Sequence, residues 1–418
     1  MAIKLTLARI ANFCYNKIVH NKFLLASGVT ICLWAAFLGY LSARSHRQLV
    51  WPTDAAAVEN SQPLATSSAT PTPENPTLGI VYGFLPYWQL TDYQLPDILT
   101  HVAYFRLAMD RHGRLVDDVA YSRLATNWDT GLLPAARQRG QNLDLTIFST
   151  NSDDLYYFAT HEQAQQTLTQ NLLHLLTQYN FDGINLDFEY LGTLTDEERA
   201  SFTNYLYHLK QELNRTHPRS KLSIDVYGSA ASMSQNLWDF SRLDEIVDRV
   251  IVMGYDYTTK ATNTPNSIAP ILGKNLWQAN LWDDLATMLA VVPSDKVILA
   301  VPFYGYDWET TTCDLSSAKT YPDTGKTLTY AAALKILSDR QYGATQHWDE
   351  VSLSPYLVYR ASNDDGENRC HIGFFENERS LAYKMDVVAK LNLGGIAIWS
   401  LGYEGHSTTL WETISQRF

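Results

Sequence analysis

Eight apolar segments of strand length, alternating with longer amphipathic segments, constrain the fold of this chain more than any other sequence feature. They are Gly79–Leu85, Thr100–Leu107, Asn142–Phe148, Asp182–Phe188, Lys221–Tyr227, Val247–Tyr255, Lys296–Phe303 and Gly394–Ser400. Strands that alternate with helices pair in parallel. Eight such repeats predict an α/β fold, a (β/α)8 TIM barrel with its active site at the carboxyl ends of the strands. An open doubly wound sheet is the alternative, but no glycine-rich phosphate loop follows the first segment.

Several segments between these strands carry helix signals. Residues 161–178 place apolar side chains at helical spacing. Thr195, followed three residues later by Glu198, resembles a capping box and predicts a helix to about Asn214. Ser380 is expected to cap another helix that runs through Leu391.

The stretch between the seventh and eighth strands holds about 90 residues, more than one helix requires, and predicts a small insertion. Cys313 and Cys370 both fall within it. They would form a disulfide if the domain lies outside the cytoplasm, and two free thiols are the alternative. Neither cysteine has the C-x-x-C or paired-histidine spacing of a zinc site, so we expect no metal and no cofactor.

The fourth strand carries an unusual row of polar side chains. In the stretch 181–190, Asn185, Asp187 and Glu189 alternate with apolar residues, so the three lie on one face. Asp187 and Glu189 are then about 6–7 Å apart. Burying neighbouring carboxylates raises their pKa values, which is typical of catalytic acids. A calcium site is the alternative, but the D-x-D-x-D-G order of an EF-hand is absent.

Aromatic residues gather at the carboxyl ends of four predicted strands. Aromatic faces stack on the apolar faces of sugar rings, and their polar rims bind hydroxyls. Any one of them could equally be packing the barrel, but four strand ends share the pattern. The candidates for substrate contact are Tyr87 and Trp88 after the first strand, Met253, Tyr255 and Asp256 at the sixth, Tyr306 and Trp308 at the seventh, and Trp399 at the eighth.

The sequence Asp182-Gly-Ile-Asn-Leu-Asp-Phe-Glu189 resembles the D-G-x-D-x-D-x-E signature of glycoside hydrolase family 18, the chitinase-like TIM barrels. Met253-x-Tyr255-Asp256 resembles the family's M-x-Y-D motif, and Trp399 stands where the family has a tryptophan. The resemblance spans roughly residues 79–405. Asn185 stands where most members have Asp, a variant that resembles the branch of spore-cortex (peptidoglycan) hydrolases and chitobiase.

This resemblance implies hydrolysis of glycans that contain β-linked N-acetylglucosamine, by a substrate-assisted mechanism with retention. Glu189 would be the general acid, and Asp187 would orient the acetamido group and stabilise the oxazolinium ion. Tyr255 would hydrogen-bond the acetamido oxygen, and Trp399 would form the floor of the −1 sugar subsite. The alternative is a membrane-tethered, lectin-like glycan-binding protein on an inactive barrel, although such relatives typically lack the acid that Glu189 provides.

Two further roles follow from the acidic stretch. Asp182 is expected to shape the start of the strand rather than to take part in chemistry. Asn185 is expected to line the substrate site and to hold Asp187 ionised, because its amide can donate a hydrogen bond. The opposing interpretation is that Asn185 only fills the barrel.

The first 77 residues differ from the rest. Residues 23–42 run for 20 positions without a charge, enough to cross a bilayer as a helix. Basic residues before this run, in segment 1–22, predict that the N-terminus is cytoplasmic. Residues 43–77 are rich in Pro, Ser and Thr and read as a linker.

We therefore expect a signal anchor followed by a catalytic domain, residues 78–418, outside the cytoplasm, at the cell surface or in the periplasm. Secretion after cleavage of a signal peptide is the alternative. The formal net charge of −12 argues against a nucleic-acid partner.

Overall fold

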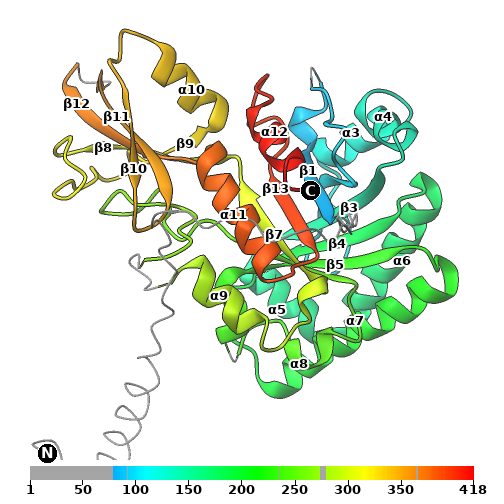
Figure 1. The fold of residues 1–418 in the computed structure, drawn as a ribbon. Helices are drawn as coiled ribbons and strands as arrows, with labels where there is room; N and C mark the ends of the chain where they lie inside the picture. The colour runs from blue at the N-terminus through cyan, green and yellow to red at the C-terminus, as the bar shows by residue number, and fades with distance from the viewer. Residues whose placement is uncertain (1–78, 92, 234, 274–278, 364–365) are drawn as a thin grey trace, which may run out of the picture. The chain divides into compact units, whose positions relative to one another are not determined.

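The computed structural model describes residues 79–418 except 92, 234, 274–278 and 364–365. Within this part of the chain, eight parallel strands close into a barrel in the order β1-β13-β7-β6-β5-β4-β3-β2. Figure 1 shows helices surrounding these strands. The predicted (β/α)8 barrel is therefore confirmed.

The barrel strands lie within two residues of their predicted bounds at each end. They are β1 Ile80–Pro86, β2 His101–Ala108, β3 Asn142–Ser149, β4 Gly183–Phe188, β5 Lys221–Tyr227, β6 Arg249–Met253, β7 Val297–Pro302 and β13 Gly395–Trp399. The seventh strand ends at Pro302, and the aromatic residues after it were wrongly placed at its carboxyl end. They begin a separate strand of the insertion.

The described α-helices outside the insertion are α3 Val119–Asn127, α4 Leu132–Gln138, α5 Ser152–Thr160, α6 Glu162–Tyr179, α7 Asp196–Thr216, α8 Phe240–Leu243, α9 Leu281–Met288, α11 Glu378–Lys390 and α12 Thr409–Ser415. Three of the helices, α6, α7 and α11, lie where the sequence predicted helices. The capping box of α7 forms as predicted, because Thr195 and Glu198 bond each other's backbone N–H groups. Helix α11 instead begins after Asn377, whose side chain accepts from the N–H of Ser380, so Ser380 is not the cap.

The insertion between β7 and β13 is an antiparallel sheet in the order β10-β11-β12-β8-β9, with helix α10 beside it (Figure 1). Its elements are β8 Tyr304–Thr310, β9 Lys326–Thr329, α10 Tyr330–Ser338, β10 Thr345–Asp349, β11 Ser354–Ser362 and β12 Asn368–Phe374. A disulfide joins Cys313 to Cys370, which are 57 residues apart in the sequence. Of the two possibilities that the sequence left open, the disulfide is therefore the one observed, not two free thiols. It links β12 to the loop after β8.

Two layers of apolar side chains hold the barrel together. Strand residues that point outward, such as Ile184, Leu186 and Phe188 of β4, pack in the large core beneath the helices. Inward residues form a smaller, largely aromatic cluster that includes Tyr82, Phe84 and Phe105. Side chains alternate between the two faces of each strand. Because the apolar face of β4 packs beneath the helices, its polar row points into the barrel.

The expected anchor at residues 23–42 and the linker at 43–77 lie outside the described residues. Among the helices of the described part, none combines the length and apolarity needed to cross a membrane.

Candidate active site

Two carboxylates stand at the carboxyl end of β4. Asp187 is the fifth residue of the strand and is 5% exposed, and Glu189 follows its last residue and is partly exposed. This is the end of the barrel at which (β/α)8 enzymes carry their chemistry. The structure therefore brings the two predicted carboxylates to the expected place. Asp182, at the other end of β4, accepts from the backbone N–H of Leu143 at 2.8 Å, consistent with a role in shaping the strand start.

Glu189 is held by a tyrosine of the neighbouring strand. The hydroxyl of Tyr227 donates to Oε2 of Glu189 at 2.6 Å. Burial raises the pKa of Glu189 above its ordinary value, the Tyr227 hydrogen bond partly opposes this, and the nearby Asp256 raises the pKa further. A raised pKa keeps the carboxyl protonated at higher pH, as a general acid requires.

Asp187 has a second carboxylate beside it. Asp225 of β5 lies in register with Asp187 and is 4% exposed. Burial raises the pKa of Asp187 well above its ordinary value, and repulsion from Asp225 and Glu189 adds to the effect. Among the described residues, Oδ1 of Asp187 has no hydrogen-bond partner.

Asn185 does not hold Asp187, contrary to our expectation. Its amide donates to Oδ1 of Asp225 at 2.8 Å and to the hydroxyl of Ser223 at 3.2 Å. Its carbonyl oxygen accepts from Thr146 at 3.0 Å, and the side chain is fully buried. The expectation that Asn185 touches substrate is therefore wrong, because its neighbours in the barrel interior occupy its polar atoms.

Tyr255 and Asp256 follow β6 and face the same end of the barrel. Tyr255 packs against the aromatic interior, with its ring centroid 6.0 Å from that of Tyr304. Oδ1 of Asp256 accepts from the hydroxyls of Tyr304 and Tyr306 at 2.6 and 2.9 Å. Both tyrosines belong to β8, so the insertion fixes an acidic residue beside the barrel opening.

Trp399 provides an aromatic surface at the end of β13. Its ring lies 4.4 Å from that of Phe105 at a steep angle, and 5.9 Å from Phe84. The side chain remains partly exposed, which leaves it free to contact a ligand. Trp88 is 42% exposed and packs edge-on against Tyr87, 4.9 Å away.

The remaining predicted contacts differ in exposure. Trp308 is fully buried in the core of the insertion and donates to the backbone carbonyl of Lys260, so it cannot stack on a sugar. Tyr306 is 7% exposed, and its hydroxyl is engaged by Asp256. Met253 is partly exposed at the end of β6. The error over Trp308 arose because strand β8 alternates, and its aromatic face packs inside the insertion.

Sequence reasoning missed Asp225 and Tyr227. In β5, Ser223, Asp225 and Tyr227 alternate with the apolar residues between them, the same period that drew attention to β4. That alternation was available in the sequence. Their proximity to Asp187 and Glu189 depends on the pairing of β4 with β5.

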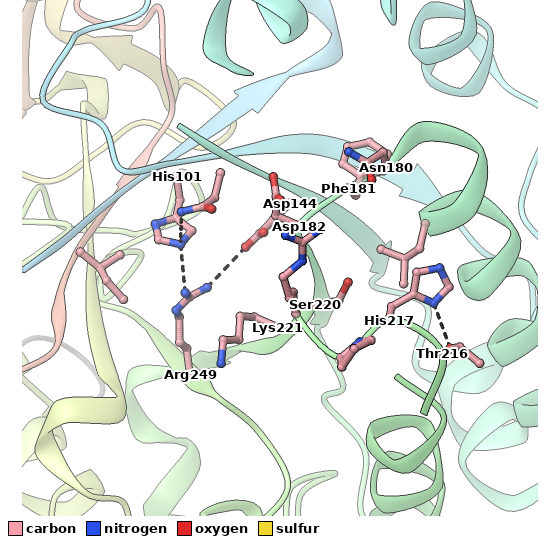
Figure 2. Close-up of a pocket in the computed structure, with 15 residues that line it drawn as sticks. His101, Asp144, Asn180, Phe181, Asp182, Thr216, His217, Ser220, Lys221 and Arg249 are labelled. Atoms are coloured by element: carbon pink, nitrogen blue, oxygen red, sulfur yellow. Dashed lines mark hydrogen bonds and ion pairs between the residues drawn. The ribbon is translucent and has the colours of Figure 1, made fainter. Parts of the chain in front are cut away.

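A polar network fills the opposite end of the barrel, at the amino ends of the strands (Figure 2). Arg249 lies 2.9 Å from Nε2 of His101 and 3.6 Å from Oδ2 of Asp144, which also accepts from Tyr82. Burial and Arg249 lower the pKa of His101 to about 3, so the ring is neutral and accepts from Arg249. This face of a (β/α)8 barrel normally serves stability.

The family model for Glycosyl hydrolases family 18 matches residues 80–404. The chain belongs to this family. It is a glycosidase, and the match covers the whole barrel and the insertion.

The names of its relatives include a glycosylase, a cortical fragment-lytic enzyme, a chitinase and a di-N-acetylchitobiase. It is 23% identical over 330 residues to the uncharacterized glycosylase YvbX of Bacillus subtilis, a match covering 78% of this chain and 87% of the relative. It is 27% identical over 277 residues to the cortical fragment-lytic enzyme of Bacillus subtilis, covering 63% of this chain and 58% of that protein. The chain thus spans less than two thirds of the latter.

Among solved structures, the family 18 chitinase from Cycas revoluta in complex with (GlcNAc)3 has a TM-score of 0.68 at 20% identity. The match covers 81% of this chain and 99% of that chain. At this identity the similarity shows that the two proteins share a fold.

Proposed function

We propose that this protein hydrolyses polymers or oligosaccharides of β-linked N-acetylglucosamine by a substrate-assisted, retaining mechanism. The observation that carries the proposal is the arrangement of Glu189 and Asp187 at the carboxyl end of β4, with Tyr255 and Trp399 at the same end of the barrel. Chitin fragments and peptidoglycan are the candidate substrates, since a chitinase and cortical fragment-lytic enzymes are among the relatives of this chain.

In this mechanism Glu189, with its raised pKa, donates a proton to the glycosidic oxygen. The acetamido carbonyl of the bound sugar then attacks the anomeric carbon and forms an oxazolinium ion. Asp187, when ionised, accepts from the acetamido N–H and stabilises the positive charge. Tyr255 keeps its proton because burial raises its pKa well above the ordinary value, so its hydroxyl can donate to the acetamido oxygen.

Lastly, water activated by the Glu189 carboxylate opens the ring, which returns the proton to Glu189 and leaves the configuration retained. The alternative of an inactive, lectin-like barrel is disfavoured, because Glu189 is present and is oriented by Tyr227 at 2.6 Å.

The test is to incubate the purified protein with N-acetylglucosamine oligomers, with peptidoglycan, and with glucosamine oligomers of the same length. We expect cleavage of one or both acetylated substrates with β-configured products at first, seen by NMR. The glucosamine oligomers should stay intact, because they lack the acetamido nucleophile. Cleavage of both kinds of oligomer at similar rates would contradict substrate assistance, and cleavage of no glycan would contradict the function.

We further propose that residues 23–42 anchor the chain in a membrane, with the catalytic domain outside the cytoplasm. The Cys313–Cys370 disulfide supports this, because disulfides persist mainly in oxidising compartments. The uncharged run of 20 residues and the basic residues before it support the orientation.

Protease added to intact cells, after removal of any outer barrier, is expected to release a soluble fragment that contains the catalytic domain. Cleavage should fall in the Pro/Ser/Thr-rich stretch 43–77, which we expect to be accessible. A cytoplasmic protein serves as the control for cell integrity. A catalytic domain that stays intact while the control also stays intact would contradict the orientation.

A further inference from the structure

Asp225 of β5 is the register partner of Asp187 on the neighbouring strand β4. The two residues are paired in register on β4 and β5, so both side chains point into the barrel. Neighbouring strands are about 4.8 Å apart. Both residues are nearly inaccessible to solvent, at 5% and 4% exposure.

The two carboxyls differ in their hydrogen bonds. Asp225 accepts from the amide of Asn185 at 2.8 Å. That amide is oriented by Thr146, whose hydroxyl donates to the carbonyl oxygen of Asn185. In contrast, Oδ1 of Asp187 has no partner among the described residues. A hydrogen bond to the charged form of a carboxyl favours that form, so in the free protein the negative charge is favoured on Asp225 and a proton on Asp187.

The surroundings oppose a second negative charge on the pair. Burial raises the pKa of Asp225 well above its ordinary value, against the effect of Asn185, and Glu189 raises it further. Two adjacent buried carboxyls titrate as a pair and do not both ionise readily. Among the described residues, the other titratable groups that interact with this pair are three tyrosines and one acid: Tyr82, Tyr227, Tyr255 and Glu189.

We propose that Asp225 is a positioning residue that takes the proton from Asp187 when a substrate acetamido group binds. The acetamido N–H supplies the donor that Asp187 lacks, which favours ionised Asp187. The O–H bond on Asp187 breaks and one forms on Asp225, with no proton exchanged with water. Asp187 thus becomes an ionised acceptor only when the sugar is present. In the empty site it carries no charge that lacks a hydrogen-bond donor.

This inference rests on the proposed hydrolysis of N-acetylglucosamine glycans, and two substitutions of Asp225 test it. Asp225→Leu removes the group that takes the proton, so Asp187 cannot pass its proton to a neighbouring carboxyl when the sugar binds. We expect kcat on a soluble oligomer to fall about 100-fold, with KM within a few-fold. In the wild type the first proton leaves the pair to give a charge on Asp225 that the Asn185 amide stabilises, whereas in the Leu variant it must leave the buried Asp187 itself. The acid limb of the pH–rate profile should therefore move to higher pH by about one unit or more.

Asp225→Asn should behave differently, because its amide can donate to ionised Asp187 while its oxygen accepts from Asn185. We expect its kcat within about tenfold of the wild type and no upward shift of the acid limb. Ser223→Ala is the matched control on β5, because it removes the other acceptor of the Asn185 amide without touching a carboxyl. Leu and Asn variants with the same kcat and the same acid limb would overturn the proposal.

Infrared difference spectroscopy provides a readout that does not depend on turnover. At neutral pH the wild type should show one more protonated carboxyl than Asp225→Asn, since the variant pair holds no proton. Equal numbers would overturn the proposal even if the Leu variant failed to fold. If the wild type cleaves no acetylated oligomer, the proposed function fails, while the infrared comparison still tests the shared proton.

Discussion

Glu189→Gln is expected to lower kcat by roughly 100- to 10,000-fold, the share that a general acid usually contributes. The amide keeps the shape of the side chain and can still accept the hydrogen bond from Tyr227, but it has no proton to transfer. Sugar binding should remain, so KM or a binding constant should change little. Turnover of a soluble N-acetylglucosamine oligomer measures the effect.

The pH profile adds a second readout. Wild-type activity should fall at high pH as Glu189 loses its proton, and the raised pKa places that fall above the ordinary range for glutamate. The variant should lose this limb. Glu197→Gln, the same change at an exposed position of α7, is the matched control and should retain full activity. Turnover of Glu189→Gln close to that of the control would show that another group protonates the leaving oxygen.

Lys384→Met is expected to lower the free energy of unfolding by about 3–5 kcal/mol, the usual effect of breaking a buried ion pair. Nζ of Lys384 on α11 lies 2.7 Å from Oε2 of Glu376, and the two side chains are 0% and 2% exposed. Without Lys384, the Glu376 carboxyl is left buried without its counter-ion. Urea unfolding of wild type and variant measures the difference.

Two further variants make this test specific. Lys335→Met, on an exposed turn of α10, is the control and should change stability by no more than about 0.5 kcal/mol. Glu376→Leu combined with Lys384→Met should recover most of the loss, because two apolar groups need no counter-ion. A loss in Lys384→Met no larger than in the control would mean that water or another group satisfies Glu376.

The alternation of side chains accounts for what could be predicted from the sequence. A strand with one apolar face and one polar face has only one way to lie in a barrel, so residues such as Ile184 and Asp187 had their sides assigned before any tertiary contact was known. The order of eight strands and the place of Glu189 at a carboxyl end followed from the same pattern. The capping box at Thr195 is equally local, because it depends on two residues in one turn.

Contacts between segments distant in sequence were decided only by the tertiary structure. The amide of Asn185 could have bonded Asp187 or Asp225, and the choice of Asp225 depends on the pairing of β4 with β5 and on Thr146 of β3. Trp308 looked like a ligand-binding residue because it follows a barrel strand, yet β8 pairs with β12 and turns its aromatic face into the insertion. Local periodicity shows on which side of a strand a residue lies. Only strand pairing decides which residue of the neighbouring strand lies beside it. The reason is that hydrogen bonds and burial depend on neighbours that can be tens of residues away in the chain.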